Sequence, residues 1–408
     1  MASAVESYLE SDYFIAETHT NTSGLLANDS LCDDTSQARI AFISAGSALS
    51  ILGCIFNAVL LYIFLGRTQK SYPFQTFLAF LDFMLCALYI HCFGLLAFSV
   101  EYRIPFLYDF IMDSNVISLV MSRIVQLSIP YTLIANSAEK LAMILGYDCE
   151  SKFSLRVRIL IILLLLLTTT LLRINGMFLL FIHEDPDCPF FHRKWLSNYP
   201  EEQEKWSYFE STLTFFHTFV SFILLCAFNI YVVIKLRVQH RKTRRQSTSP
   251  AQLFSGDDPR TEQGEDTQTE IEVIPEPETE ASTSARNHAA QEIREQQHKI
   301  KCAVKTTVVI ISAYLACNFI NFFLYSLETF KRSWIVEENG GFASFYVILS
   351  DLGSSLFVFS SSIRVFIYYK YNSEIKELIR DMAIVRYVIE QVNGTKRDTL
   401  LKLDRVDV

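Results

Sequence analysis

The run ASFYVILSDLGSSLFVFSSSIRVFIYY, residues 343–369, contains only two charged side chains, Asp351 and Arg364. An α-helix needs about 20 predominantly apolar residues to cross the hydrocarbon core of a bilayer. The run exceeds that length, yet its segment SSIRVFIY, residues 361–368, carries a full positive charge at Arg364. An unpaired arginine inside a bilayer costs about 3 kcal/mol or more. The run therefore predicts a membrane helix in which Arg364 needs a partner.

Similar runs recur along the chain and set the fold class. Half of the 408 residues are apolar, and 33 are Phe and 19 Tyr. Seven runs with few or no charges are each long enough to span a membrane: residues 40–66, 71–100, 114–138, 159–183, 211–234, 306–327 and 339–369. A buried helix of a soluble protein explains one such run but not seven. We therefore expect an all-α membrane protein, a bundle of seven transmembrane helices.

The charges between these runs predict the orientation. The first 38 residues contain no Lys or Arg and include two N-glycosylation sequons, at Asn21 and Asn28. Basic residues follow the odd-numbered runs, which by the positive-inside rule places the N-terminus outside and the C-terminus in the cytoplasm. We expect a multi-pass protein of the plasma membrane. Its parts are an extracellular tail (1–38), a membrane domain (39–382) and a cytoplasmic tail (383–408).

Two polar segments lie on the expected inner side. The third inner loop, residues 241–299, has basic ends and an acidic, proline-containing centre, a composition that cannot bury a core. We expect it to be disordered, with its basic ends continuing helices 5 and 6. After the seventh run, residues 373–380 alternate apolar and charged side chains at helical spacing, which predicts an amphipathic eighth helix on the inner membrane surface.

The sequence lacks the patterns that catalysis requires. It contains no phosphate-binding loop, no nucleophile elbow and no cluster with metal-ligand spacing. We therefore expect no enzyme activity, no cofactor, no metal and no nucleic-acid partner. The expected surroundings are membrane lipid, an extracellular ligand and a cytoplasmic partner.

Short motifs in the runs indicate a family. The chain resembles the rhodopsin-like (class A) G-protein-coupled receptors over roughly residues 39–382. The motifs that carry the resemblance are Phe56-Asn57-Ala-Val59, Leu78-Ala-Phe-Leu-Asp82, Ser137-Ala-Glu139-Lys140-Leu141, Tyr231-Val-Val-Ile234, Tyr314-Leu-Ala-Cys317-Asn318 and Arg364-Val-Phe-Ile-Tyr368. Asn318 stands where most members have Trp, which is similar to the invertebrate FMRFamide-type neuropeptide receptors.

The chain also departs from that family's pattern. Helix-kinking prolines are replaced by Ile223, Ile320 and Val365, and Lys140 replaces an arginine whose planar fork lysine does not reproduce. Asn115 replaces a cysteine that normally pairs with the second outer loop. The resemblance therefore leaves Cys188 without its usual partner. We expect it to pair with Cys32, while both being free or intermolecular stays open.

The resemblance implies two further groups of functional residues. Glu139, Lys140, Tyr231 and Tyr368 occupy positions that couple such receptors to a heterotrimeric G protein. Asp82 and Arg364 occupy positions where family members hold a sodium ion, so we expect an intramembrane ion pair in its place. Asn57 and serines of helix 7 are expected to complete its hydrogen bonds. The alternative is that Arg364 extends to the inner surface.

Polar residues in the outer halves of the runs are the candidate ligand contacts: Arg123, Gln126, Arg173, His217, Asn318, Asn321 and Asp351. For each Asn, Gln or His, an interhelical hydrogen bond is an equal alternative. A retinal-binding lysine is missing from helix 7, and Ser122 stands where amine receptors have aspartate. Acidic residues on the outer surface favour a cationic ligand.

These observations favour a receptor for a neuropeptide that activates a G protein. Three alternatives remain open. One is a chemosensory receptor for a small odorant or pheromone. Another is a transporter or channel whose path is lined by the intramembrane charges. The third is a receptor-like protein that binds without signalling, which the substitution at Lys140 would explain.

Overall fold

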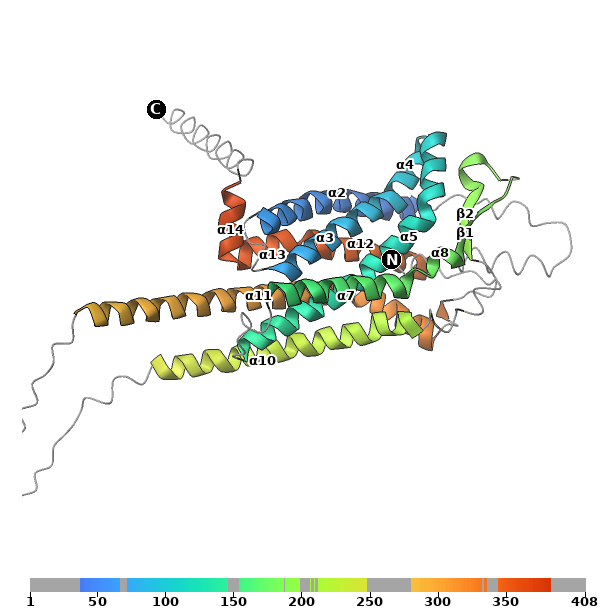
Figure 1. Ribbon diagram of the computed structural model, residues 1–408. Coiled ribbons are helices and arrows are strands. Elements are labelled where there is room, and N and C mark those ends of the chain that lie inside the picture. The colour runs from blue at the N-terminus through green and yellow to red at the C-terminus, as the bar shows by residue number, and fades with distance from the viewer. Residues whose placement is uncertain are drawn as a thin grey trace, which may run out of the picture.

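The computed structural model describes residues 37–66, 72–145, 154–186, 188–198, 206, 209, 212–247, 280–331, 334–335 and 344–382. Figure 1 shows these segments as a bundle of long helices with a small hairpin at one end. The elements are α2 (Gln37–Gly66), α3 (Pro73–Tyr89), η1 (Ile90–Leu95), α4 (Leu96–Glu101), α5 (Pro105–Ile144), α7 (Leu155–Arg173), α8 (Gly176–Leu179), β1 (Leu180–Glu184), η2 (Phe190–His192), β2 (Lys194–Asn198), η3 (Phe216–Val220), α10 (Ser221–Ser247), α11 (Glu280–Phe330), α12 (Ser344–Ser362), α13 (Arg364–Tyr371) and α14 (Ser373–Arg380).

The predicted seven-helix bundle is confirmed. The described residues contain seven helical spans long and apolar enough to cross a membrane. They are Ile40–Gly66, Pro73–Glu101, Pro105–Ile144, Leu155–Leu179, Thr212–Val238, Lys301–Phe330 and Phe345–Tyr371. Apolar side chains such as Leu163, Leu167 and Leu171 of α7 are exposed on the bundle surface. Such a surface is stable against lipid tails, so the chain is a multi-pass membrane protein.

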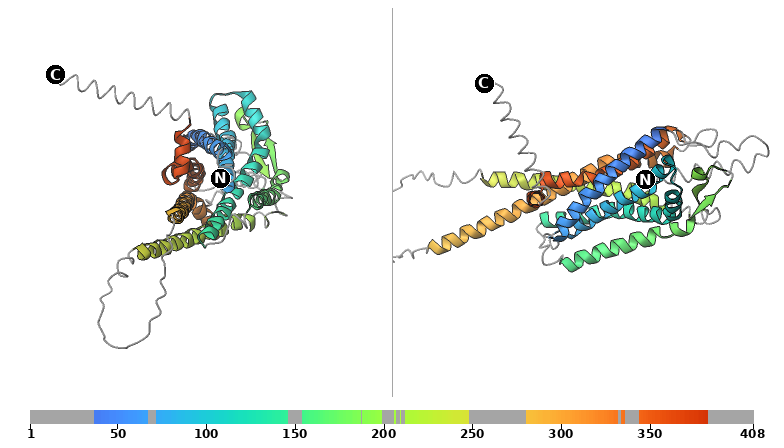
Figure 2. Two further views of the ribbon diagram at one scale, coloured as in Figure 1. Left: turned by 60° about the vertical axis from the view of Figure 1, so that its left-hand side comes forward. Right: turned by 90° about the horizontal axis from the view of Figure 1, so that it is seen from above.

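Helix α5 forms the centre of the bundle. In the apolar stretch of 18 residues that represents each span, 72% of the α5 residues are buried, against 17% in the span that contains α7. Helix α5 is therefore central and α7 peripheral. Helix α5 contacts α3, α7, α10 and α11, and the end-on view of Figure 2 shows α10 to one side of the others. The main core joins α3, α5 and α12 through fully buried side chains such as Leu85, Ile129 and Val358.

The hairpin changes the bounds of two predicted spans. The third begins at Pro105, nine residues before the predicted start at Ser114, because α5 continues through Asp109 and Asp113, whose charges bond to the hairpin. The fourth ends at Leu179 rather than His183, since residues 180–184 form strand β1. Strand β1 pairs antiparallel with β2, with His183 opposite Trp195.

The predicted continuation of the fifth and sixth helices into the ends of the third inner loop is found in the structure. Helix α10 continues to Ser247 and α11 begins at Glu280, so both ends of residues 241–299 are helical. Figure 1 shows α10 and α11 extending beyond the bundle at the end where α14 lies. That end is called the α14 end, and the opposite one, which carries β1 and β2, the hairpin end. Residues 248–279 and the predicted tail 383–408 lie outside the described residues.

A short amphipathic helix follows the seventh span. The Asn372 side chain caps α14 by accepting hydrogen bonds from the backbone N–H groups of Glu374 and Ile375. Ile375 and Ile379 are buried against the bundle, whereas Glu374 and Glu377 are not buried. This four-residue spacing produces one apolar face. Its attachment to the inner membrane surface stays a prediction.

Candidate ligand-binding site

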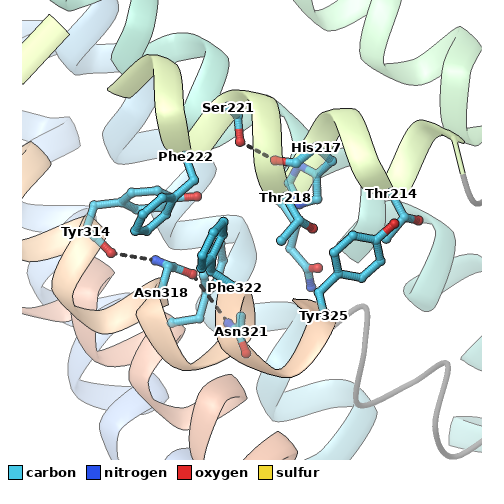
Figure 3. A pocket seen from close by; sticks show the side chains of 12 residues that line it. Thr214, His217, Thr218, Ser221, Phe222, Tyr314, Asn318, Asn321, Phe322 and Tyr325 are labelled. Carbon is cyan, nitrogen blue, oxygen red and sulfur yellow. Dashed lines mark hydrogen bonds between the residues drawn. The ribbon is translucent and has the colours of Figure 1, made fainter. Parts of the chain in front are cut away.

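A cavity of about 60 Å³ lies between α5, the helix formed by η3 and α10, α11 and α12. Figure 3 shows side chains from η3 and α10 facing those from α11 across it. Its lining residues are Gln126, Thr214, His217, Thr218, Ser221, Phe222, Tyr314, Asn318, Asn321, Phe322, Tyr325 and Phe357. The wall thus combines amide, hydroxyl and imidazole groups with aromatic rings, and none of these side chains carries a fixed charge.

The α11 wall follows from a simple helical pattern. Tyr314, Asn318, Asn321 and Tyr325 recur every three or four residues, so they share one face. Asn318 Nδ2 donates to the Tyr314 carbonyl at 2.9 Å, and Asn321 Nδ2 donates to Asn318 Oδ1 at 3.4 Å (Figure 3). These bonds fix the amides. Asn321 Oδ1 is enclosed and has no hydrogen-bond donor within the described part of the chain.

Gly353 allows α12 to approach this wall closely. A Cβ atom at Gly353 would overlap Asn321 Oδ1. Without it, Asn321 Nδ2 reaches the Gly353 carbonyl at 3.5 Å. The glycine therefore sets the position of Asn321, through the absence of a side chain rather than through any contact of its own.

A π-helical segment shapes the opposite wall. The π-helix η3 covers Phe216–Val220, and Ser221 Oγ donates to the His217 carbonyl just after it. A π turn inserts one residue into an α-helix and shifts the register of its faces. Four polar residues of this region, Thr214, His217, Thr218 and Ser221, line the cavity. His217 Nδ1 is buried and has no partner among the described residues.

Four predicted ligand contacts line this cavity, and three do not. Gln126, His217, Asn318 and Asn321 come together from three helices. Arg123 and Arg173 are buried outside the lining, at 8% and 2% exposure, and Asp351 is half-buried on α12. A ligand would therefore have to extend beyond this cavity to contact Arg123, Arg173 or Asp351, and the predicted role of these three residues stays a prediction.

Sequence reasoning missed eight of the lining residues: Thr214, Thr218, Ser221, Phe222, Tyr314, Phe322, Tyr325 and Phe357. Those on α11 repeat with the period of Asn318 and Asn321, so the face could have been extended from the two amides. The η3 residues carried no such signal, because the π turn breaks the helical period there.

The hairpin is tied to the first turns of α5. Lys194 Nζ lies 2.8 Å from Asp109 Oδ1 and 3.5 Å from Asp113 Oδ1, and Arg193 Nε lies 3.1 Å from Glu184 Oε1. The hydrogen bond to Asp109 raises the pKa of the Lys194 ammonium above its usual value. Leu180 and Leu196 pack on α5 below these contacts. The expected acidic surface is thus partly neutralised by the hairpin's own cations.

Cys188, beside this hairpin, is disulfide-bonded. The other described cysteines, Cys54, Cys86, Cys92, Cys226, Cys302 and Cys317, form no disulfide, so its partner lies outside the described residues. Cys32 also lies outside them, as do Asn21 and Asn28, and their predicted roles stay predictions.

The structure brings Asp82 and Arg364 into contact in the middle of the bundle. Arg364 Nη1 donates to Asp82 Oδ2, and the side chains are 2% and 1% exposed. Arg364 begins α13 directly after the interruption at Ile363. The expected contribution of Asn57 is wrong. Its amide instead donates to the Gly53 carbonyl at 2.9 Å and to the Ser361 carbonyl at 3.3 Å, which joins α2 to the end of α12.

The coupling residues predicted at the α14 end do not form one cluster. Glu139 and Lys140 are both buried, with Glu139 Oε1 2.9 Å from Arg158 Nε of α7 and Lys140 Nζ 3.6 Å from Glu139 Oε2. Tyr368 is buried against Phe64, whereas Tyr231 is exposed on the bundle surface. In this conformation Lys140 is therefore enclosed rather than presented to a partner.

Two polar connections at this end were not predicted. Asn136 of α5 accepts from Gln75 Nε2 at 3.0 Å and donates to Thr307 Oγ1 at 3.5 Å, linking α3, α5 and α11. Tyr72 donates to Glu374 Oε2 of α14 at 2.9 Å, and its ring centroid lies 5.9 Å from Lys140 Nζ. Burial, followed by the charge of Glu374, raises the pKa of Tyr72, so the phenol retains the proton it donates.

Comparison with known proteins identifies a family. The model of a family described as "Serpentine type 7TM GPCR chemoreceptor Srx" matches residues 48–253, which is half of the chain. The matched segment runs from α2 through α10 and includes Gln126 and the η3 side of the cavity. No curated protein matches the chain.

Proposed function

Because the chain belongs to the Srx family of serpentine seven-transmembrane GPCR chemoreceptors, we propose that it is a plasma-membrane chemoreceptor for a small molecule. The ligand binds in the cavity between α5, η3–α10, α11 and α12, and binding activates a heterotrimeric G protein. The cavity itself carries this proposal, since it gathers polar side chains from three helices, and two of their atoms, His217 Nδ1 and Asn321 Oδ1, have no partner among the described residues.

The size of the cavity favours a small ligand over a peptide. Sites for drug-sized molecules measure roughly 300–1,000 Å³, whereas this cavity measures about 60 Å³. A small molecule fits after modest side-chain movement. A peptide would have to open the bundle or leave most of its length outside the cavity. The chemosensory alternative therefore ranks above the neuropeptide, and the resemblance to FMRFamide-type receptors stays a prediction.

The neuropeptide remains the second candidate, on the acidic residues near the hairpin end. The side chains of Asp109, Asp113 and Glu184 are 37%, 71% and 50% exposed. Their contacts with Lys194 and Arg193 reduce the field that would attract a cationic peptide. This pairing supports the small molecule.

The proposed orientation places the hairpin end outside the cell and the α14 end in the cytoplasm, as the basic residues predict. Signalling then requires α11 to move at the α14 end, so that Glu139 and Lys140 become accessible to the G protein. The enclosed state of Lys140 and the connection of Asn136 to Thr307 support reading this conformation as inactive.

The test is a functional screen in cells that express the full chain with a promiscuous G-protein α subunit. A library of small volatile and water-soluble metabolites is applied beside a library of amidated peptides, with calcium release as readout. A small-molecule response that Asn318→Ala weakens at least about tenfold is expected. A response to peptides alone favours the second candidate, and ligand-gated ion flux without nucleotide exchange contradicts the receptor proposal.

A further inference from the structure

Arg123 of α5 is a buried cation to which the described part of the chain supplies no partner. The residue is only 8% exposed. Within the described part of the chain it makes no hydrogen bond or ion pair, and its Nε is fully enclosed without an acceptor. A buried charge in a membrane bundle is normally compensated by a partner or faces a functional cavity. Within the described residues, this position therefore lacks an anion.

The place of Arg123 on α5 connects it to the candidate ligand site. It precedes Gln126, which lines the cavity, by three residues. Three residues of α-helix correspond to a rise of about 4.5 Å and an offset of about 60° around the axis. Because α5 runs from the hairpin end, Arg123 lies beside the cavity and one turn closer to the hairpin.

The wall of the cavity carries an imidazole ring close to a second buried arginine. Arg173, which ends α7, is 2% exposed and lies close enough to His217 for its charge to act on that ring. His217 faces the cavity and has a buried ring nitrogen without a partner among the described residues. Asp109 and Asp113, the acidic residues at the start of α5, are already engaged by Lys194.

We propose, on the basis of the proposed function, that the ligand of this site is a small organic acid whose carboxylate pairs with Arg123. A guanidinium presents parallel N–H groups that match the two oxygens of a carboxylate, which makes this pair both strong and directional. The body of the acid then extends past Gln126 toward Phe222 and Phe322, whose rings stack with centroids 4.6 Å apart and form the apolar wall.

The experiment measures thermal unfolding of the full chain in nanodiscs of phosphatidylcholine. The probes are benzoate, indole-3-acetate and hexanoate, each compared with its uncharged methyl ester at millimolar concentration. At least one acid is expected to raise Tm and its ester is not. Arg123→Met should lower the affinity for that acid at least about tenfold. Without ligand, the same variant should raise Tm, because the uncompensated charge is removed.

The control is Arg193→Met, which removes an arginine that already contacts Glu184 at the hairpin; its response to the acid should equal that of the wild type. The proposal is overturned if no acid shifts Tm, if esters act equally, or if Arg123→Met without ligand lowers Tm, since Arg123 would then be a structural residue. Replacing part of the lipid with phosphatidylglycerol separates the sources of the anion. A rise in Tm that requires both this lipid and Arg123 would identify a lipid headgroup and reject the soluble acid.

Binding and signalling can fail independently. An acid that binds through Arg123 without activating a G protein contradicts the proposed function and leaves this inference intact. An uncharged agonist whose action depends on Asn318 but not on Arg123 would support the proposed receptor function and contradict the proposal that the ligand is an organic acid.

Discussion

Arg364, at the first turn of α13, donates to Asp82 of α3 in the middle of the membrane bundle, although 282 residues separate them in the chain. Both side chains are almost fully enclosed. The pair explains how a full charge is accommodated in the seventh span, and it ties α3 to the interruption at Ile363 between α12 and α13.

Neutralising one member of this pair should impair folding more than exchanging the two charges. Asp82→Asn is expected to cost about 3–5 kcal/mol, because Arg364 is left buried and unpaired. The exchange Asp82→Arg with Arg364→Asp should restore part of the loss. Surface expression of tagged receptor measures both. Normal expression of Asp82→Asn would show that the two charges do not depend on each other.

The same pair predicts insensitivity to sodium. Since the Arg364 guanidinium already places a fixed positive charge on Asp82 Oδ2, exchanging NaCl for choline chloride should leave Tm and agonist affinity unchanged. Thermal unfolding at equal ionic strength checks this. A sodium-specific shift that Asp82→Asn abolishes would contradict it.

Gly353 should control the ligand site without contacting a ligand. Gly353→Ala places a Cβ against Asn321 Oδ1 and displaces that amide from the cavity wall. We expect at least about a tenfold loss of agonist potency with smaller effects on expression. Gly66→Ala is the matched control, because a Cβ there meets nothing within 4 Å. Equal potency of the two variants would mean that Asn321 plays no part in binding.

The connection between Asn136 and Thr307 should hold α11 in its resting position. Thr307→Val removes the hydroxyl and is expected to raise ligand-independent nucleotide exchange. Thr306→Val is the control, since that hydroxyl bonds to the Cys302 carbonyl of its own helix. If both variants keep wild-type basal exchange, the hydrogen bond does not restrain α11.

Lys140 should act only after the helices separate. Lys140→Ala is expected to abolish signalling while agonist binding survives, whereas Arg158→Gln frees Glu139 and should change basal exchange instead. Radioligand binding and nucleotide exchange on the same membranes distinguish the two effects. Full signalling by Lys140→Ala would remove it from the coupling site.

The sequence by itself determined the membrane fold. A span needs a fixed number of apolar residues because the bilayer has a fixed thickness, and every backbone polar group in it must bond internally, so seven runs give seven helices. The charge of Arg364 likewise required a partner, and the motif order suggested Asp82. Gln126, His217, Asn318 and Asn321 could be proposed because polar side chains in apolar helices are rare and thus conspicuous.

Only the tertiary structure decided which of these residues share a cavity. Composition does not reveal how far each helix is rotated or where it is interrupted. The π turn of η3 reorients the residues around His217, and the absence of a side chain at Gly353 positions Asn321. Arg123 and Lys140 are similar cations in the sequence, yet packing pairs Lys140 with Glu139 and gives Arg123 no partner among the described residues. Such differences depend on contacts between helices distant in the chain, which no local pattern encodes.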